Sequence, residues 1–253
     1  MATIISFAQL KGGEGKTTST GAVGAALARR GYRVLLVDAD PQANLTYGLG
    51  YKDLTDRTLY EALYGKYKAA EILLPANGYE LIPASLGLSG VEMELSARIG
   101  RERLLEGLLT PLRGRYDFIL IDCPPSIGLL TLNALATSDW VLVPMQSEIH
   151  SLQGLRKILE ILQLVKDNQV NEHIDLLGIV LNKHDRRKIL HKDIYDTIQE
   201  EFPGKLFGIT IRTNIAIAES QTVGQDIFAY DPESNGAADY DVLTTEMLER
   251  LKV

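Results

Sequence analysis

Short apolar runs alternate with segments of helical spacing along most of the chain, and this alternation leaves few possible folds. Near-continuous runs of Val, Ile and Leu are typical of strands buried on both faces. Such strands need helices above and below the sheet, and this arrangement favours parallel pairing. Strands are predicted at residues 3–8, 33–37, 80–83, 118–121, 140–144, 176–181 and 206–211. Helices are predicted at residues 17–30, 90–109, 128–136, 152–166 and 193–201. We therefore expect an α/β fold, a mainly parallel twisted sheet with helices on both faces.

Composition points to one soluble domain covering residues 1–253, because 45% of the residues are hydrophobic and no repeat or linker interrupts the pattern. The single cysteine, Cys123, excludes an intramolecular disulfide and favours a cytoplasmic location. We expect neither a signal peptide nor a membrane span, since no uncharged apolar run approaches about 18 residues. A net charge of −7 argues against a protein that is basic throughout, but a local basic patch remains possible.

The segment AQLKGGEGKTT, residues 8–18, lies between the first predicted strand and the first predicted helix. It departs from the P-loop pattern, because Leu10 stands where the first glycine should be. In this context backbone N–H groups can surround a phosphate, and the helix N-terminus adds its positive dipole end. Lys16 is expected to contact the phosphates and to act in catalysis. The Thr17 hydroxyl is expected to bind Mg²⁺. The predicted nucleotide-binding residues of this loop are Lys11, Gly12, Gly13, Glu14, Gly15, Lys16, Thr17 and Thr18.

Carboxylates follow two other predicted strands, at the sheet edge where open α/β sheets bind ligands. Asp38 is the candidate catalytic residue that orients or deprotonates a water attacking the terminal phosphate. Asp40 is a candidate for the metal shell, although both residues could instead cap a turn before Pro41. The run Phe-Ile-Leu-Ile before Asp122 has the Walker B form, in which the aspartate holds Mg²⁺ or its waters.

Five motifs in order resemble the ParA/MinD family of deviant-Walker ATPases, above all its small ParA-type partition and positioning members. The motifs are KGGEGKTT, DADPQANLT, LIPASLGLSGVEMEL, YDFILIDCPPSIGLLTLNAL and YDPESNGA, and the likeness runs from residue 4 to about residue 240. The resemblance implies a P-loop ATPase with ATP and Mg²⁺ as cofactors and slow, partner-stimulated hydrolysis. It also implies that Asn182, at the end of a predicted strand, contacts the adenine base.

In this family the lysine corresponding to Lys11 contacts the ATP held by the other subunit, so the resemblance implies a homodimer that forms on ATP. Because this cation reaches the phosphates only from the partner subunit, dimer formation depends on whether ATP is bound. Glu14 is a departure, since relatives mostly carry a small or apolar residue there. Because a carboxylate would repel phosphate, we expect the Glu14 side chain to point away, towards the dimer face.

The resemblance further implies a cytoplasmic, nucleoid-associated protein that binds DNA non-specifically as an ATP-bound dimer. A ParB-like or organelle adaptor would stimulate its release, and the cargo would be a plasmid, a chromosome or a protein organelle such as the carboxysome. The densest basic run makes Arg186, Arg187 and Lys188 candidate DNA contacts, although so short a run is also typical of a solvated loop. Thr213 and Ala216 replace arginines of the family pattern, so part of the family's DNA surface is missing, and Arg212 or Lys205 is a candidate to compensate.

Three alternatives are open at this point. Asn182, Lys183 and Asp185 match the Asn-Lys-x-Asp spacing by which small GTPases recognise guanine. A MinD-like role would need a membrane-binding tail, but residues 242–253 carry mixed charges and are expected to pack on the domain, so no stable membrane association is expected. A metabolic ligase that activates a carboxylate with ATP could use the same scaffold, but it would need a substrate pocket that the sequence does not reveal.

Overall fold

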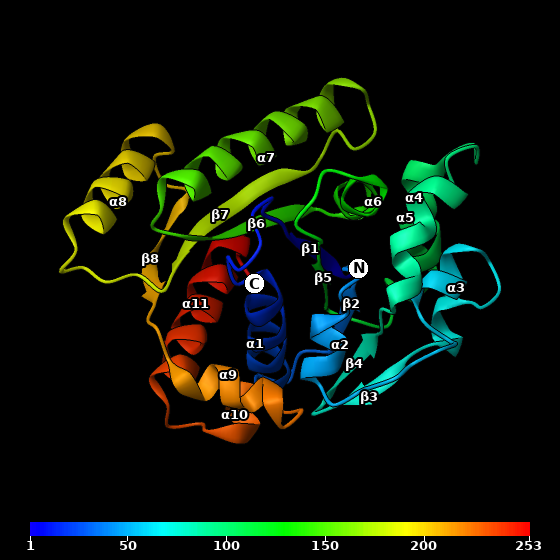
Figure 1. The fold of residues 1–253 in the computed structure, drawn as a ribbon, viewed down its shortest axis with the longest axis horizontal. Helices are drawn as coiled ribbons and strands as arrows, with labels where there is room; N and C mark the ends of the chain where they lie inside the picture. The colour runs from blue at the N-terminus through cyan, green and yellow to red at the C-terminus, as the bar shows by residue number, and fades with distance from the viewer.

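The computed structural model describes residues 1–253 and contains one eight-stranded sheet (Figure 1). Its strands are β1 (Thr3–Phe7), β2 (Val34–Asp38), β3 (Leu74–Ala76), β4 (Tyr79–Ile82), β5 (Phe118–Asp122), β6 (Trp140–Gln146), β7 (Asp175–Asn182) and β8 (Leu206–Ile211). Across the sheet their order is β3-β4-β2-β5-β1-β6-β7-β8, and only β3 runs antiparallel to its neighbour. The predicted α/β fold with a mainly parallel sheet is therefore confirmed.

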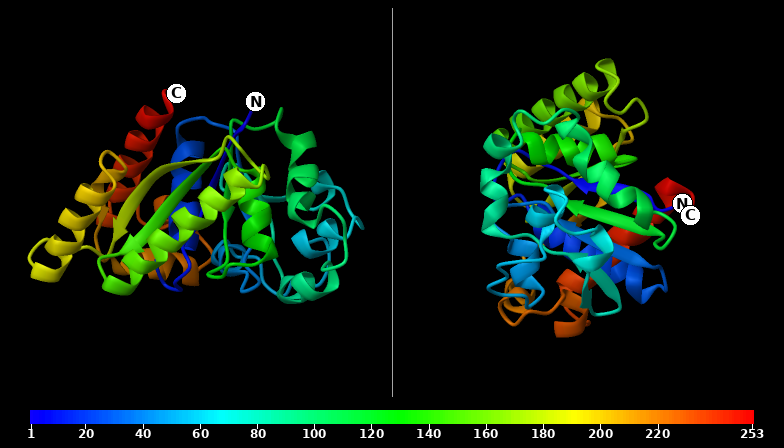
Figure 2. Two further views of the ribbon diagram at one scale, coloured as in Figure 1. Left: turned by 90° about the horizontal axis from the view of Figure 1, so that it is seen from above. Right: turned by 90° about the vertical axis from the view of Figure 1, so that its right-hand side faces the viewer.

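Helices cover both faces of the sheet, which explains why its strands are almost continuously apolar. One face packs against α1 (Lys16–Arg29), α2 (Asn44–Gly48), α10 (Ile227–Tyr230) and α11 (Asn235–Leu251). The other packs against α3 (Leu59–Leu63), α5 (Leu104–Leu109), α6 (Leu129–Thr137), α7 (Ile149–Asp167) and α8 (Ile189–Glu201). In β5, Ile119 and Ile121 enter one core, whereas Phe118 and Leu120 enter the other, as the two-residue period of a strand requires. Figure 2 shows the two chain ends on the same side of the molecule.

The helix predicted at residues 90–109 is wrong, because the chain there is broken into short elements. These are α4 (Val91–Glu94), the 3₁₀ turn η3 (Arg101–Arg103) and α5. Gly100 lies between them with φ +71°, a left-handed conformation that no helix interior contains. Several short elements were not predicted at all: β3, α2, α3, α9 (Ile215–Thr222), α10 and the 3₁₀ turns η1 (Ala69–Glu71), η2 (Leu86–Gly90) and η4 (Thr110–Leu112).

The carboxyl-terminal segment packs on the sheet, as expected. Residues 242–253 include the whole second half of α11, where Leu243 and Met247 are fully buried. Glu246 accepts hydrogen bonds from the backbone N–H groups of Gly208 and Ile209, and Arg250 donates to the carbonyl oxygen of Leu206. These contacts cover the outer edge of β8, which would otherwise expose unpaired backbone groups. No helix combines the length and the apolar character that a membrane crossing requires.

Candidate nucleotide site

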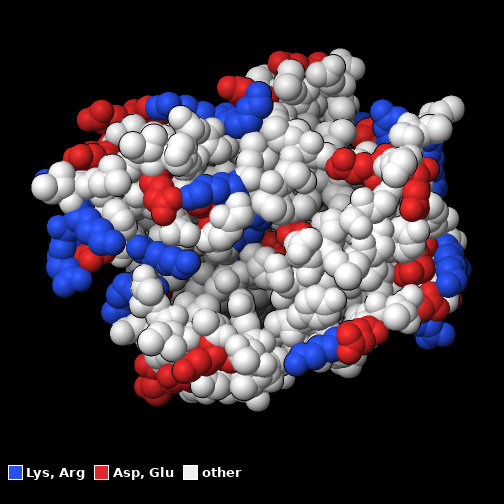
Figure 3. Space-filling view, viewed as in Figure 1, with Lys and Arg blue, Asp and Glu red and all other residues white.

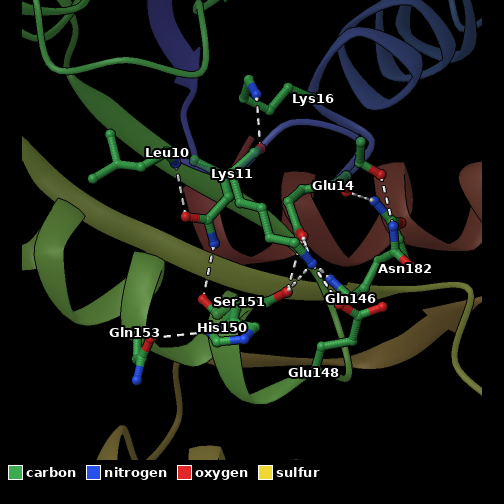
Figure 4. A network of polar contacts seen from close by, with 12 residues as sticks. Leu10, Lys11, Glu14, Lys16, Gln146, Glu148, His150, Ser151, Gln153 and Asn182 are labelled. Carbon is green, nitrogen blue, oxygen red and sulfur yellow. Dashed lines mark hydrogen bonds and ion pairs between the residues drawn. The ribbon is translucent and has the colours of Figure 1, made fainter.

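The loop between β1 and α1 has the geometry of a phosphate-binding loop. Gly13 and Gly15 have φ +80° and +90°, values that favour glycine. A Cβ atom at Gly15 would lie 2.3 Å from Nδ2 of Asn182, so the close approach to β7 also needs glycine. Lys16 begins α1, and its Nζ donates a hydrogen bond to the carbonyl oxygen of Lys11 at 3.4 Å (Figure 4). The predicted strand, glycine loop and helix thus follow each other as the motif requires.

Two adjoining hollows open beside this loop, and together we call them the nucleotide hollow. The larger has a volume of about 730 Å³ and is lined mostly by polar residues, including Gly12, Gly13, Gly15, Lys16, Thr17, Thr18, Asp40, Lys52 and Gln221. The smaller, of about 200 Å³, shares part of this lining and adds Asn182, Ile211, Asn214 and Ile217. A large polar hollow joined to a smaller one that has some apolar side chains in its lining fits phosphates joined to a base. Lys52 and Gln221 belong to no motif, so sequence reasoning missed them.

Asp38 and Asp122 face each other at the carboxyl ends of β2 and β5, where the strand register pairs them directly. Both side chains are fully buried. Asp38 accepts hydrogen bonds from the backbone N–H and the hydroxyl of Thr46, at 2.9 and 2.7 Å, and from the N–H of Asp40. Burial nevertheless raises the pKa of Asp38 to about 6. A group with this pKa can accept and release a proton near neutral pH.

Asp122 is the carboxylate that fits a metal ion. Neither of its oxygens has a hydrogen-bond partner, although the group is fully buried. Burial, and then the neighbouring charge of Asp38, raises the pKa of Asp122 well above its usual value. A divalent cation would satisfy these oxygens and offset the repulsion between the two aspartates. No cluster of three or more His, Cys, Asp or Glu side chains is placed to hold a metal alone, so the further ligands would include phosphate and water oxygens.

Asp40 and Thr17 lie closer to the surface, in the wall of the nucleotide hollow. Oδ1 of Asp40 accepts a hydrogen bond from the backbone N–H of Gln42 at 2.9 Å. The turn-capping role considered for Asp40 is therefore present, and its place in the wall also lets it approach a metal at the phosphates.

Asn182 connects the end of β7 to the glycine loop. Its Nδ2 donates to the backbone carbonyl oxygen of Glu14 at 2.7 Å. Its Oδ1 is buried and has no partner, and the side chain lines the smaller hollow. A buried acceptor without a partner is rare and costs free energy, so it marks a place where a ligand donor fits. The exocyclic amino group of adenine is such a donor.

Comparison with known proteins agrees with this geometry. The family model described as an AAA domain matches residues 2–176. The chain is 39% identical to the chromosome partitioning protein ParA of Myxococcus xanthus over 98% of this chain and 88% of that protein. It is 38% identical to the sporulation initiation inhibitor protein Soj of Bacillus subtilis, with 98% of each chain covered. The chain belongs to the ParA/MinD family of ATPases.

Solved structures of other proteins with this fold superpose closely on this ParA/MinD ATPase. Cobyrinic acid a,c-diamide synthase of Mycobacterium smegmatis, solved with ADP and magnesium, is 32% identical with a TM-score of 0.87, and 100% and 96% of the two chains are covered. The septum site-determining protein MinD of Pyrococcus horikoshii, solved with Mg-ADP, is 28% identical with a TM-score of 0.81, and 100% and 99% are covered.

Lys11, the lysine that distinguishes the ParA/MinD loop, contacts carboxylates of its own chain. Its Nζ lies 3.1 Å from Oε1 of Glu14 and 2.5 Å from Oε2 of Glu148 (Figure 4). Glu14 points away from the phosphate side of the loop, as expected, and its orientation towards a dimer face stays a prediction. The side chain is fully buried inside its own subunit, between the loop and the start of α7. Neither Lys11 nor Glu14 lines the nucleotide hollow.

The guanine-recognition alternative does not fit this ParA/MinD ATPase. Asp185 would have to point at the base next to Asn182. Instead its two carboxylate oxygens pair with Nε and Nη2 of Arg187, at 2.9 and 3.0 Å. Asp185 also lines a different hollow from Asn182. The Asn-Lys-x-Asp spacing is therefore not accompanied by the side-chain arrangement that reads guanine.

The candidate DNA contacts lie beside the nucleotide hollow. A hollow of about 600 Å³, which we call the basic hollow, is lined by His184, Asp185, Arg186, Arg187, Ile209, Thr210, Arg212, Thr213 and Asp239. Lys188 is exposed at the start of α8, outside this lining. Figure 3 shows Lys and Arg side chains gathered at the left-hand edge of this face, over the loop between β7 and α8. Arg187 and Arg212 are already paired with Asp185 and Asp239, whereas no ion pair involves Arg186 or Lys188.

Proposed function

We propose that this chain is an ATP-dependent positioning ATPase that binds DNA non-specifically as a dimer and releases it after partner-stimulated hydrolysis. The observation that carries the proposal is the fully buried, unpartnered carboxylate of Asp122 beside a P-loop that has a second lysine. An acidic site of this kind next to phosphate-binding N–H groups fits a magnesium nucleotide. The proposal treats residues 1–253 as a single ATPase domain, because one sheet extends from β1 to β8.

In the proposed site each group has one role. The N–H groups of the loop from Gly12 to Thr17 and the ammonium of Lys16 bind the phosphates. Asp122, the Thr17 hydroxyl and Asp40 would hold Mg²⁺, which would neutralise charge on the phosphates. Asp38 orients the attacking water and accepts its proton, a role that its pKa of about 6 permits. Asn182 accepts a hydrogen bond from the adenine amino group.

The dimer is proposed from Lys11. The positively charged side chain of Lys11 does not line the nucleotide hollow of its own subunit. Inserted into the hollow of a partner, the ammonium would stabilise phosphate charge only in the assembled state. Nucleotide binding would then favour dimerisation by mass action.

The proposed cargo is a plasmid, a chromosome or a protein organelle, recruited by a ParB-like or organelle adaptor that stimulates hydrolysis. Relatives named as chromosome partitioning proteins support this class of role. Exposed cations at the basic hollow would contact DNA phosphates, and two-fold doubling in a dimer would strengthen the attraction. The expected location is the cytoplasm, on the nucleoid.

Co-sedimentation with plasmid DNA tests the proposal, with ATP, with GTP and without nucleotide, at several salt concentrations. We expect binding that requires ATP and weakens steeply with salt. Binding that ignores nucleotide, or a clear preference for GTP, would contradict the proposal. Liposomes in a parallel sample test the MinD-like alternative, which the burial of the apolar residues of α11 disfavours.

A metabolic ligase is the second candidate, because cobyrinic acid a,c-diamide synthase shares the fold at 32% identity. A ligase needs a substrate pocket at the phosphate end of the nucleotide hollow. Of the remaining large hollows, the basic hollow suits polyanions, and one of about 310 Å³ lies at Arg33 and Arg115, near the opposite ends of the strands. Phosphate release without any added carboxylic acid or amine favours the positioning ATPase over the ligase.

A further inference from the structure

The Lys11 side chain lies between two carboxylates of its own subunit, which we call the acidic pair: Glu14 and Glu148. Its Nζ is 3.1 Å from Oε1 of Glu14 and 2.5 Å from Oε2 of Glu148. Figure 4 shows the side chains of Lys11 and Lys16 on opposite sides of the loop, with Lys11 directed to the start of α7. The lysine that the proposed dimer needs is thus bound within its own chain.

The carboxylate of Glu14 is fixed in position, because each of its two oxygens accepts a hydrogen bond from the protein. Oε2 accepts a hydrogen bond from the backbone N–H of Gln146 at 2.6 Å, and Oε1 accepts one from the Ser151 hydroxyl at 2.9 Å. Ser151 is itself anchored, since its carbonyl oxygen accepts from Nε2 of the fully buried Gln9. The carboxylate therefore stays in place whether or not Lys11 is there.

The charge balance of this cluster depends on Lys11. Glu14 is fully buried, and Lys11 is the only cation within ion-pair distance of it. When Lys11 leaves, Glu14 keeps only neutral donors, and a buried charge without a counterion is unfavourable. Glu148 is half exposed, so water compensates for the loss of its partner much more easily.

We propose that the acidic pair holds Lys11 in the nucleotide-free subunit, so that the acidic pair and the phosphates of a partner's ATP compete for one ammonium. Glu14 is then a positioning residue that acts through Lys11. This inference rests on the proposed function, and it gives the glutamate in the glycine loop a role: it raises the protein concentration at which ATP produces a dimer. Because each dimer releases two Lys11 side chains, the effect of the acidic pair on the dimer dissociation constant is squared.

Two charge-removing variants, Glu14→Gln and Glu148→Gln, test the proposal. Glu160→Gln is the matched control, because Glu160 lies on α7 and also forms an ion pair, with Lys157, but away from Lys11. Sedimentation velocity with Mg²⁺ and a non-hydrolysable ATP analogue measures the dimer dissociation constant. We expect roughly threefold tighter association per subunit, hence on the order of tenfold for the dimer, in each test variant and no change in the control.

The second measurement does not depend on dimers. The rate at which an amine-reactive acetylating reagent labels Lys11 in the nucleotide-free protein is compared with the rate at Lys52. In both test variants Lys11 should react at least about threefold faster, because an amine that loses a neighbouring carboxylate is less protonated. This readout follows the Lys11 amine itself and would not change if Glu14 had only a structural role.

The outcomes separate the two proposals. Unchanged Lys11 labelling in both variants, or dimer constants that are equal to or weaker than that of the wild type, overturns the inference. Faster labelling without any nucleotide-dependent dimer in any protein supports the hold on Lys11 and contradicts the proposed function instead. If circular dichroism shows that Glu14→Gln does not fold, the same criteria apply to Glu148→Gln, because the Glu148 side chain is half exposed.

Discussion

The nucleotide hollow and the basic hollow are neighbours on one edge of the sheet, but their charged groups are held in opposite ways. Beside the first, and not part of its lining, Asp38 and Asp122 are fully buried at fixed strand ends. In the second, the arginines are largely exposed, and Arg187 and Arg212 are paired with aspartates. A buried charge interacts strongly and specifically with its partner, because water cannot replace that partner. The interactions of an exposed charge are weaker and depend on the salt concentration. Single changes should therefore have large effects in the nucleotide hollow and graded effects in the basic hollow.

The largest effect is expected at Asp38. Replacing Asp38 with Ala should lower ATP turnover by roughly 100- to 10,000-fold, because a positioned general base is lost, while ATP binding persists. Phosphate release under saturating ATP measures turnover, and a fluorescent ATP analogue measures binding. Asp38→Asn is the control, since its amide can still accept the hydrogen bond from Thr46. Near-normal turnover in both variants would remove Asp38 from catalysis.

Lys16→Ala should weaken nucleotide binding about a hundredfold or more, because the phosphates lose a largely buried cation. Equilibrium titration with the fluorescent analogue in Mg²⁺ measures this loss. Lys157→Ala, a change of the same kind on the surface of α7, should leave binding unchanged. Equal binding by Lys16→Ala and the wild type would show that the loop does not hold the phosphates.

In the basic hollow, the unpaired cations should matter more than the paired ones. The double variant Arg186→Ala, Lys188→Ala should weaken ATP-dependent DNA binding by on the order of tenfold and lower the salt slope by about one for each cation removed from a DNA phosphate. Arg187→Ala should have a smaller effect, because Asp185 already neutralises that residue. Asp185→Asn should strengthen binding. Fluorescence anisotropy at several salt concentrations measures the DNA affinity of all these variants. A greater loss of affinity in Arg187→Ala than in the double variant would contradict the claim that the unpaired cations matter more.

Arg212→Ala is expected to affect folding more than DNA binding. Asp239 is almost fully buried, and it pairs with the Arg212 guanidinium at 2.7 Å. Removing the arginine leaves this carboxylate with the backbone N–H of residue 212, so the free energy of unfolding should fall by about 1 kcal/mol. Urea denaturation measures the loss. Unchanged stability together with abolished DNA binding would place Arg212 among the DNA contacts after all.

The buried strands and the phosphate loop could be predicted from the sequence, because their signals are local. Continuous apolar runs identified β1, β5 and β8, and the glycine spacing located the loop and the start of α1. Strand-end aspartates were expected at one edge, and the register places Asp38 opposite Asp122 there.

Other features depend on contacts between distant parts of the chain, and no local pattern marks them. Glu148 meets Lys11 across 137 residues, and Asp239 meets Arg212 across 27. Whether a cation is free or neutralised is decided by such contacts. The break at Gly100 in the helix predicted at residues 90–109 was missed, because apolar residues recur on both sides of this glycine.

Sedimentation velocity of the wild type and Lys11→Ala, each with Mg²⁺ and a non-hydrolysable ATP analogue, tests the central claim most directly. Both proteins should bind the analogue, because Lys11 does not line the nucleotide hollow. The wild type should then sediment as a dimer and Lys11→Ala as a monomer, because only Lys11 would join one subunit to the phosphates of the other. A Lys11→Ala protein that dimerises on the analogue as readily as the wild type would contradict the claim.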